Sequence, residues 1–414
     1  MERLPGFRDF YPEPVPHTDV WSADARQFIF DTWRTIARRY NFREYDGPPL
    51  EPLELFTTKS GDEIVGQLYN FTDKGERAIA LRPEMTPTLA RMIAAHERNY
   101  KKPVKWFAIP QLFRYERQQK GRLREHFQFN ADIIGETDPA ADAELIALLI
   151  DTLRSFGLTE QDFVIRLSSR NAWQDFYKKG SKATANGHEY EFFQTIDKLE
   201  RATPEESEKK LAALGFSLAD VNQFIESGTP TAELESILQN LAARGLRSFA
   251  KVDYQVIRGL AYYTGVVFEA FDAKGEFRAI AGGGRYNNLV KLISGGKVDL
   301  PALGFGMGDV VLLELLKDRK LLPAFDSRTD VFVLIEDEAL RPQSLQLVQD
   351  LRTAGYAVEY PLTPAKADKQ FKRAQELKAA HTAKLENDEY VRIRNLKTRA
   401  ELTTGFASAK NHLR

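Results

Sequence analysis

The 414-residue sequence contains no cysteine, and this absence excludes disulfide bonds, thiolate nucleophiles and cysteine-ligated metal centres. Its six histidines are scattered along the chain and show none of the short spacings that metal ligands adopt. We therefore expect no metal site built from side chains. What remains is a globular composition, 43% apolar and 28% charged, in a chain long enough for two or three domains.

The sequence also lacks long hydrophobic runs. No stretch approaches the roughly 18 consecutive apolar residues of a membrane span, and residues 1–12 have no apolar core of the kind found in signal peptides. We therefore expect a cytoplasmic location. An excess of one charge sign is missing as well, because 58 Lys and Arg residues balance 59 Asp and Glu residues. A nucleic acid would then have to bind at a local basic patch.

The most informative stretch is residues 112–135, LFRYERQQKGRLREHFQFNADIIG. Its two halves alternate apolar and polar residues, which predicts two β-strands joined by a polar loop. Because side chains alternate along a strand, Arg114 and Glu116 share one face of the first strand. The same rule places Gln128, Asn130 and Asp132 together on one face of the second strand.

Two explanations fit this polar face: it lies in water, as in many antiparallel sheets, or it binds a ligand. A solvated face is usually rich in Lys, Glu and Thr, whereas this face carries Arg, Glu, Gln, Asn and Asp, which fix direction in hydrogen-bonded sites. The intervening loop, residues 117–124, carries four basic residues around Gly121 and is suited to phosphate oxygens. We therefore favour a ligand site.

Residues before this stretch predict a long amphipathic helix at 21–40 and a hairpin around residues 73–75. A turn then leads into a further helix, with Thr86 as its N-cap and Pro87 at its first helical position. Two roles remain open for Glu84 and Thr86: they cap and solvate the helix, or they receive a ligand's ammonium group.

The segments after residue 135 include predicted structural elements and two stretches that could bind a ligand. Asp138 caps an apolar helix that ends near Gly157. The glycine-rich AGGGRY at residues 281–286 is either a flexible turn or a nucleotide cradle built from backbone N–H groups. From residue 328 the pattern predicts a βαβ unit. Residues 366–414 carry twelve Lys and Arg against six Asp and Glu, which is either a solvated helix face or an anion-binding surface.

Several of these segments resemble one known family. FRYERQQKGRLREHFQF at residues 113–129 resembles motif 2 of the class II aminoacyl-tRNA synthetases, in the form found in histidyl-tRNA synthetases. RPEMT, RGLAYY and GGGRYN, starting at residues 82, 258 and 282, are similar to the family's RPEGT, RGLDYY and GGGRYD elements. Residues 303–316 resemble motif 3, but Val311 stands where the family has an arginine that stacks on ATP. We expect Lys120 or Arg122 to compensate.

The resemblance implies an α+β fold with an antiparallel-sheet catalytic core of the class II synthetases at residues 1–170 and 248–325. It further implies a helical insertion at 171–247 and a C-terminal α/β anticodon-binding domain at 328–414. The implied function is histidine–tRNA ligase, acting as a homodimer: L-histidine is activated with ATP to histidyl-adenylate and transferred to the 3′ end of tRNA(His). Mg²⁺ would bridge the triphosphate.

The resemblance also assigns roles to individual residues. Arg114 and Arg258 are catalytic; Glu84, Met85, Thr86, Gln128, Asp132, Tyr262 and Tyr263 bind histidine; Arg114, Glu116, Arg122, Gly283, Gly284 and Gly306 bind ATP; and Arg117 and Gln119 meet the tRNA acceptor end.

Two non-catalytic alternatives remain beside the ligase. One is the synthetase-like regulatory subunit of ATP phosphoribosyltransferase, which would sense histidine. Such subunits usually lack the terminal domain and the ATP-binding arginines, whereas this chain has residues 328–414 and the basic loop. The other is a synthetase-like sensor that binds tRNA without activating histidine. The presence of residues 328–414 and of the basic loop favours the ligase over the regulatory subunit.

Overall fold

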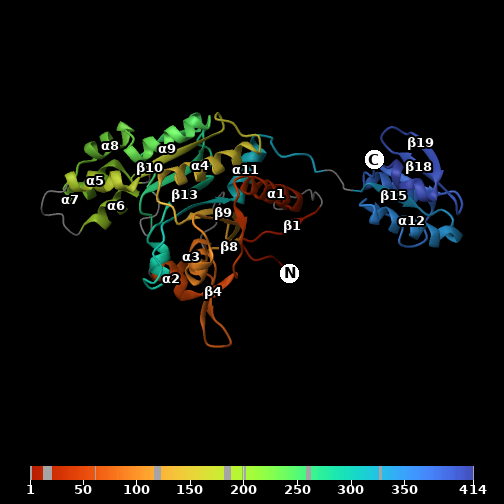
Figure 1. The fold of residues 1–414 in the computed structure, drawn as a ribbon, viewed down its shortest axis with the longest axis horizontal. Coiled ribbons are helices and arrows are strands. Elements are labelled where there is room, and N and C mark those ends of the chain that lie inside the picture. The colour runs from red at the N-terminus through yellow and green to blue at the C-terminus, as the bar shows by residue number, and fades with distance from the viewer. Residues whose placement is uncertain are drawn as a thin grey trace. The chain divides into compact units, whose positions relative to one another are not determined.

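The computed structural model describes residues 2–12, 21–60, 62–115, 123–180, 188–197, 199, 202–257, 263–325 and 329–413. The chain divides into two compact units, Met1–Leu322 and Pro323–Arg414 (Figure 1). Within the described ranges, no helix combines the length and the apolar character needed to cross a membrane.

A largely antiparallel sheet is the centre of the first unit. In the described residues it has nine strands in the order β11-β10-β12-β13-β14-β9-β7-β3, with β8 paired to β9. Among the strands that the structure describes in this sheet, only the outer pairs β10–β11 and β3–β7 are parallel. The antiparallel-sheet α+β fold expected from the sequence is therefore confirmed. The strands are β3 (Arg43–Glu44), β7 (Val104–Ala108), β8 (Gln111–Phe113), β9 (Glu125–Ile134), β10 (Phe163–Ser169), β11 (Ala250–Val252), β12 (Val266–Asp272), β13 (Ala281–Arg285) and β14 (Ala302–Gly308).

Helices cover both faces of this sheet (Figure 1). On one face, α1, α4 and α11 pack against the large core that contains Trp33, Leu149 and Phe129. On the other face, α3 and α10 pack Leu89 and Leu289 against the sheet. The helices of this unit are α1 (Ala23–Arg39), α2 (Leu53–Ser60), α3 (Thr86–His96), α4 (Pro139–Arg154), α5 (Arg170–Gly180), α6 (Glu189–Asp197), α7 (Pro204–Ala213), α8 (Leu218–Ser227), α9 (Ala232–Ala243), α10 (Leu289–Ile293) and α11 (Asp309–Asp318).

Two small sheets complete the unit. The strands β1 (Phe10–Tyr11) and β2 (Trp21–Ser22) form a parallel pair. The strands β4 (Leu50–Pro52), β5 (Asn70–Thr72) and β6 (Ala78–Leu81) form an antiparallel sheet. The predicted hairpin around residues 73–75 is therefore confirmed as the β5–β6 connection.

The sequence predicted the N-cap of α4 correctly and the N-cap of α3 one residue too late. The Asp138 side chain accepts a hydrogen bond of 2.8 Å from the Ala140 N–H, so the predicted cap of α4 is confirmed. For α3 the predicted cap is wrong by one residue. Met85 already has helical backbone angles, φ −95° and ψ −24°, and is itself the N-cap residue. Thr86 therefore lies inside the first turn.

A buried ion triad ties the N-terminal segment to the central sheet. The Arg8 guanidinium donates to Glu125 at 2.7 Å and to Asp309 at 2.8 Å. Burial by itself would lower the pKa of Arg8, but the two facing carboxylates raise it above its ordinary value. Gln111 donates a further bond to Glu125, and the Phe127 N–H donates one to Asp309. Arg8 thus joins the start of β9 to the start of α11.

The second unit is a five-stranded sheet with helices on both faces. Its order is β16-β15-β17-β18-β19, with β15 parallel to β16 and β17. The βαβ unit predicted from residue 328 is therefore confirmed, with the helix α12 between β15 and β16. The elements are β15 (Val331–Leu334), α12 (Arg341–Thr353), β16 (Val358–Glu359), α13 (Ala367–Glu376), β17 (His381–Leu385), β18 (Tyr390–Asn395), β19 (Glu401–Gly405) and the 3-10 helix η5 (Phe406–His412).

Candidate active site

The polar side chains of β9 lie on the sheet face opposite the large core. Phe129 and Ile133 are buried in that core, and the alternate residues Gln128 and Asp132 face the other way. The alternation predicted from the sequence is therefore confirmed. Asp132 lies across from Gly304 of β14, and Gln128 lies across from Gly308.

Glycines on β14 make room for these side chains. A Cβ atom added at Gly304 would overlap the Asp132 carboxylate, and one added at Gly306 would lie 2.6 Å from Cδ of Gln128. Both contacts are closer than a real Cβ atom could approach, so only glycine at these two positions allows Asp132 and Gln128 to lie across the neighbouring strand. Gly306, which the sequence assigned to ATP, thus also has a packing role toward Gln128.

A pocket of about 200 Å³ opens on this face. Its polar lining consists of the side chains of Arg114, His126, Gln128 and Arg278. No carboxylate belongs to the lining among the residues that the structure describes. The pocket is therefore lined by two arginines, and guanidinium groups suit an anionic ligand.

The rest of the pocket wall is apolar or glycine. Val310 and Val311 come from the first turn of α11, and Ile280 comes from the residues before β13. Gly282 lines the pocket floor with Gly306. The sequence pointed to Gly283 and Gly284 instead; a Cβ at Gly283 would press on Phe305 and one at Gly284 on Tyr263.

The turn that precedes α3 is fixed by two arginines. Arg82 is buried and donates to the Gly47 carbonyl at 2.6 Å and to Asp46 at 3.1 Å. Nε of Arg114 donates to the Pro83 carbonyl at 3.1 Å. These bonds hold the turn against β8, so Arg114 and the residues 84–86 belong to one framework. Within that turn Met85 is fully buried, whereas Glu84 and Thr86 are half-buried.

Asp132 is the most perturbed carboxylate of the site. Its Oδ1 accepts a hydrogen bond from the Tyr286 hydroxyl, and no described basic side chain pairs with it. Burial raises the pKa of Asp132 to about 7, although the bond from Tyr286 acts in the opposite direction. The carboxylate therefore changes its charge near neutral pH. Tyr286 was not named from the sequence, although it belongs to the GGGRY segment.

Tyr45 is a second tyrosine that sequence reasoning missed. Its ring contacts Trp106 with 5.6 Å between centroids, and Trp106 is the cross-strand neighbour of Asp132. Its hydroxyl is buried and makes no hydrogen bond within the described residues. Burial first, and then the charge of Asp132, raise the pKa of Tyr45 well above its ordinary value. No local pattern could have found Tyr45, because its neighbours come from β7 and β9.

The arginine of the GGGRY segment has a structural role. Arg285 is buried, donates to the Asp142 carboxylate of α4, and also donates to the carbonyls of Glu136 and Asp138. Burial raises the pKa of Asp142 to about 6, and the Arg285 charge limits the shift. These bonds use the Arg285 guanidinium to anchor β13 to α4, away from the pocket lining.

Several residues named from the sequence lie outside the described residues. These are Glu116, Arg117, Gln119, Lys120 and Arg122 of the basic loop, together with Arg258 and Tyr262. Tyr263 is described and lies beside Gly284. The structure therefore brings Arg114, Gln128 and Gly306 into one pocket lining, and Asp132 lies on the same face of β9 as Gln128.

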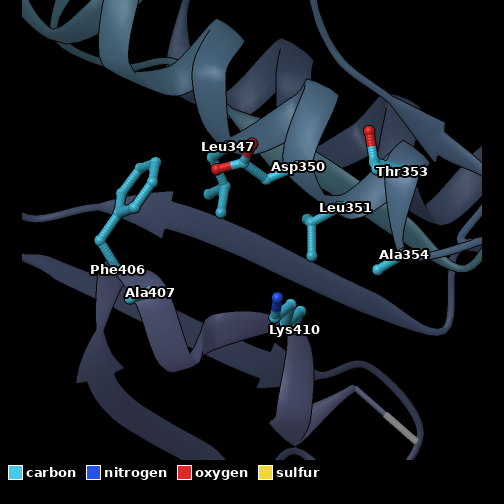
Figure 2. Close-up of a pocket in the computed structure, with 8 residues that line it drawn as sticks. All are labelled: Leu347, Asp350, Leu351, Thr353, Ala354, Phe406, Ala407 and Lys410. Atoms are coloured by element: carbon cyan, nitrogen blue, oxygen red, sulfur yellow. The ribbon is translucent and has the colours of Figure 1, made fainter.

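A second hollow lies in the other unit, apart from any residue named for the site. It has a volume of about 440 Å³. Figure 2 shows Leu347, Asp350 and Leu351 of α12 on one side and Phe406 and Lys410 of η5 on the other. Its lining holds one carboxylate and one ammonium group, whereas two arginines line the first pocket.

Comparisons with known proteins agree on one family. The family model for histidyl-tRNA synthetase matches residues 22–309. A histidine–tRNA ligase from Opitutus terrae is 46% identical over 427 aligned positions, which cover 97% of this chain and 95% of the relative. A histidine–tRNA ligase of Arabidopsis thaliana, described as chloroplastic/mitochondrial, is 37% identical and covers 90% of this chain and 78% of its own length.

Solved structures share the fold. The histidyl-tRNA synthetase from Nostoc sp. PCC 7120 superposes with a TM-score of 0.77 at 22% identity, covering 99% of this chain and 97% of that chain. At such identity the likeness concerns the fold alone, and it does not by itself separate a catalytic from a non-catalytic protein.

Proposed function

The chain belongs to the histidyl-tRNA synthetase family, and we propose from this premise how its site works as a histidine–tRNA ligase. A histidine carboxylate oxygen bonds to the α-phosphorus of ATP, pyrophosphate leaves, and histidyl-adenylate forms. A hydroxyl of the 3′-terminal ribose of tRNA(His) then displaces AMP. The observation that carries this function is the 46% identity along 97% of the chain.

For the ATP half of the site, we propose Arg114 as the catalytic cation. Activation depends on positioning and on stabilising the charge that develops on the phosphoryl oxygens, and a guanidinium serves both purposes. The pocket lined by Arg114 and Gly306 supports this assignment. By resemblance, Arg258 takes the other side of the phosphate and Glu116 the adenine amino group. Arg122 and the backbone of residues 283–284 complete the ATP site, and Mg²⁺ enters bound to the nucleotide as part of the substrate.

For the histidine half, we propose that Asp132 accepts a hydrogen bond from one imidazole N–H. Tyr262 or Tyr263 serves the other ring nitrogen, and Tyr286 holds the Asp132 carboxylate in place. By resemblance Glu84, Thr86 and Gln128 bind the ammonium group. Met85 contributes by packing, because its side chain is fully buried.

For tRNA, we propose that Arg117 and Gln119 meet the acceptor end and that residues 328–414 bind the anticodon. Phosphate contacts should make this binding weaken steeply with salt. The division into a catalytic core at 1–170 and 248–325 with a helical insertion at 171–247 is part of the same proposal, as are a homodimer and a cytoplasmic location. Light scattering on the purified protein would measure the oligomeric state.

The function is tested by histidine-dependent exchange of labelled pyrophosphate into ATP. We expect exchange with histidine and none with the other amino acids, followed by charging of tRNA(His). A protein that binds histidine but gives no exchange would contradict the ligase function and favour the regulatory subunit of ATP phosphoribosyltransferase.

Asp132→Asn is expected to lower kcat/KM for histidine by about 10–100-fold, because a hydrogen bond to a charged group contributes about 1.5–3 kcal/mol. In the wild type, kcat/KM should rise with pH through about 7, since the ionised carboxylate accepts from the imidazole N–H more strongly than the protonated acid does. In the variant only the imidazole of the substrate should titrate, near pH 6.5. Asp299→Asn is the matched control, because Asp299 is an exposed partner of Lys291. An Asp132 variant within two-fold of wild type would disprove the role.

A further inference from the structure

The pocket beside β9 holds a second arginine that no family motif assigns. Arg278 lines it together with Arg114, although the two residues come from different elements. Arg114 follows β8, whereas Arg278 lies in the connection between β12 and β13. Two arginines from separate elements therefore line one pocket, and a guanidinium is a donor suited to phosphate oxygens.

The wall formed by α11 supplies no charge. Val310 and Val311 are its lining residues, and Val311 stands where the resemblance places an arginine. Valine cannot donate a hydrogen bond or offer a positive charge to a phosphate oxygen. A cationic contact in this pocket must therefore come from another element. Arg114 and Arg278 are the arginines of the described lining, and Arg114 is already assigned as the catalytic cation, which leaves Arg278.

The connection that carries Arg278 is anchored at both ends. Near its start, the Glu276 N–H donates to the Asp272 carboxylate at 2.9 Å, and Asp272 pairs with Arg319 at 2.6 Å. Near its end, the Ile280 N–H donates to the Ala270 carbonyl at 2.8 Å. Arg278 lies between these two fixed points, so its backbone position at the pocket edge is defined by the fold.

We propose that Arg278 is an ATP-binding residue, whose guanidinium contacts the phosphate oxygens and replaces the cation that α11 lacks. A guanidinium stays charged at all working pH values and can donate two parallel hydrogen bonds to a phosphate. This inference rests on the proposed ligase function and names a residue of the same site. It differs from the sequence-based expectation, which assigned the compensation to Lys120 or Arg122.

The test is Arg278→Ala in histidine-dependent pyrophosphate exchange. The KM for ATP is expected to rise by about 10–100-fold, corresponding to one lost charged hydrogen bond, while the KM for histidine stays within two-fold. Arg278→Lys keeps the charge and loses the bidentate geometry, so its KM for ATP should lie between those of the wild type and Arg278→Ala. Lys274→Ala is the matched control, because Lys274 is an exposed cation of the same connection outside the pocket lining. An ATP KM within two-fold of wild type in Arg278→Ala would overturn the proposal.

Direct binding separates failure of this inference from failure of the ligase function. Calorimetric titration with MgATP needs no turnover, so it applies even to a protein that shows no exchange. Binding that is weakened at least tenfold in Arg278→Ala and unchanged in Lys274→Ala would support the role of Arg278. Equal binding by wild type and Arg278→Ala would refute it, whatever the exchange assay shows.

Discussion

Replacing Arg8 by methionine is expected to lower the free energy of unfolding of the first unit by about 3–5 kcal/mol, the cost of breaking a buried ion pair by removing one partner. Arg8 is the cation shared by Glu125 and Asp309, and all three side chains are almost fully buried. Methionine fills similar space but leaves two carboxylates without a counter-charge. The loss should be larger at pH 8 than at pH 5, since burial raises the pKa of Asp309 and its protonation at low pH removes one of the two unpaired charges.

Tryptophan fluorescence during urea unfolding would measure this effect. The four tryptophans of the chain, at positions 21, 33, 106 and 173, all belong to the unit Met1–Leu322, so their signal reports that unit alone. Arg3→Met is the matched control. Arg3 pairs with Asp9 near the same chain end, but its side chain is 36% exposed, and exposed pairs contribute at most about 1 kcal/mol. Equal unfolding curves for the two variants would rule out a stabilising triad.

Arg114→Ala is expected to lower kcat for histidine-dependent pyrophosphate exchange by about 10²–10³-fold, the usual effect of removing one group that stabilises transition-state charge. Arg114 lines the pocket, and its Nε is held by the Pro83 carbonyl. That bond orients the guanidinium before ATP arrives, so little reorganisation is needed during the reaction. The ATP KM should change less than kcat, because the charge that Arg114 meets develops mainly in the transition state.

Two further variants test whether the charge of Arg114 is the catalytic feature. Arg114→Gln keeps an amide donor for the Pro83 carbonyl and loses the charge, so its kcat should be as low as that of the alanine variant. Arg98→Ala removes an arginine that is 94% exposed and should leave exchange unchanged. If Arg114→Gln restored kcat to within five-fold of wild type, the charge of Arg114 would not be the catalytic feature.

The sequence by itself determined features that depend on neighbours along the chain. Alternation predicted which side chains of β9 enter the core, because a strand places successive side chains on opposite faces. Asp138 could be predicted as a cap because the cap and the N–H that it accepts from are only two residues apart. The same local reasoning failed at α3, where the fully buried Met85 begins the helical backbone one residue earlier than the threonine pattern indicates.

Only the tertiary structure decided which distant side chains share an environment. Arg8 meets carboxylates 117 and 301 positions away, and Tyr286 reaches Asp132 across 154 positions. Arg278 lines the same pocket as Arg114, although the two residues are 164 positions apart, because the sheet brings the β12–β13 connection beside the end of β8. Periodicity and capping depend on neighbours a few residues apart, whereas burial, pKa and charge pairing depend on which segments the sheet brings together.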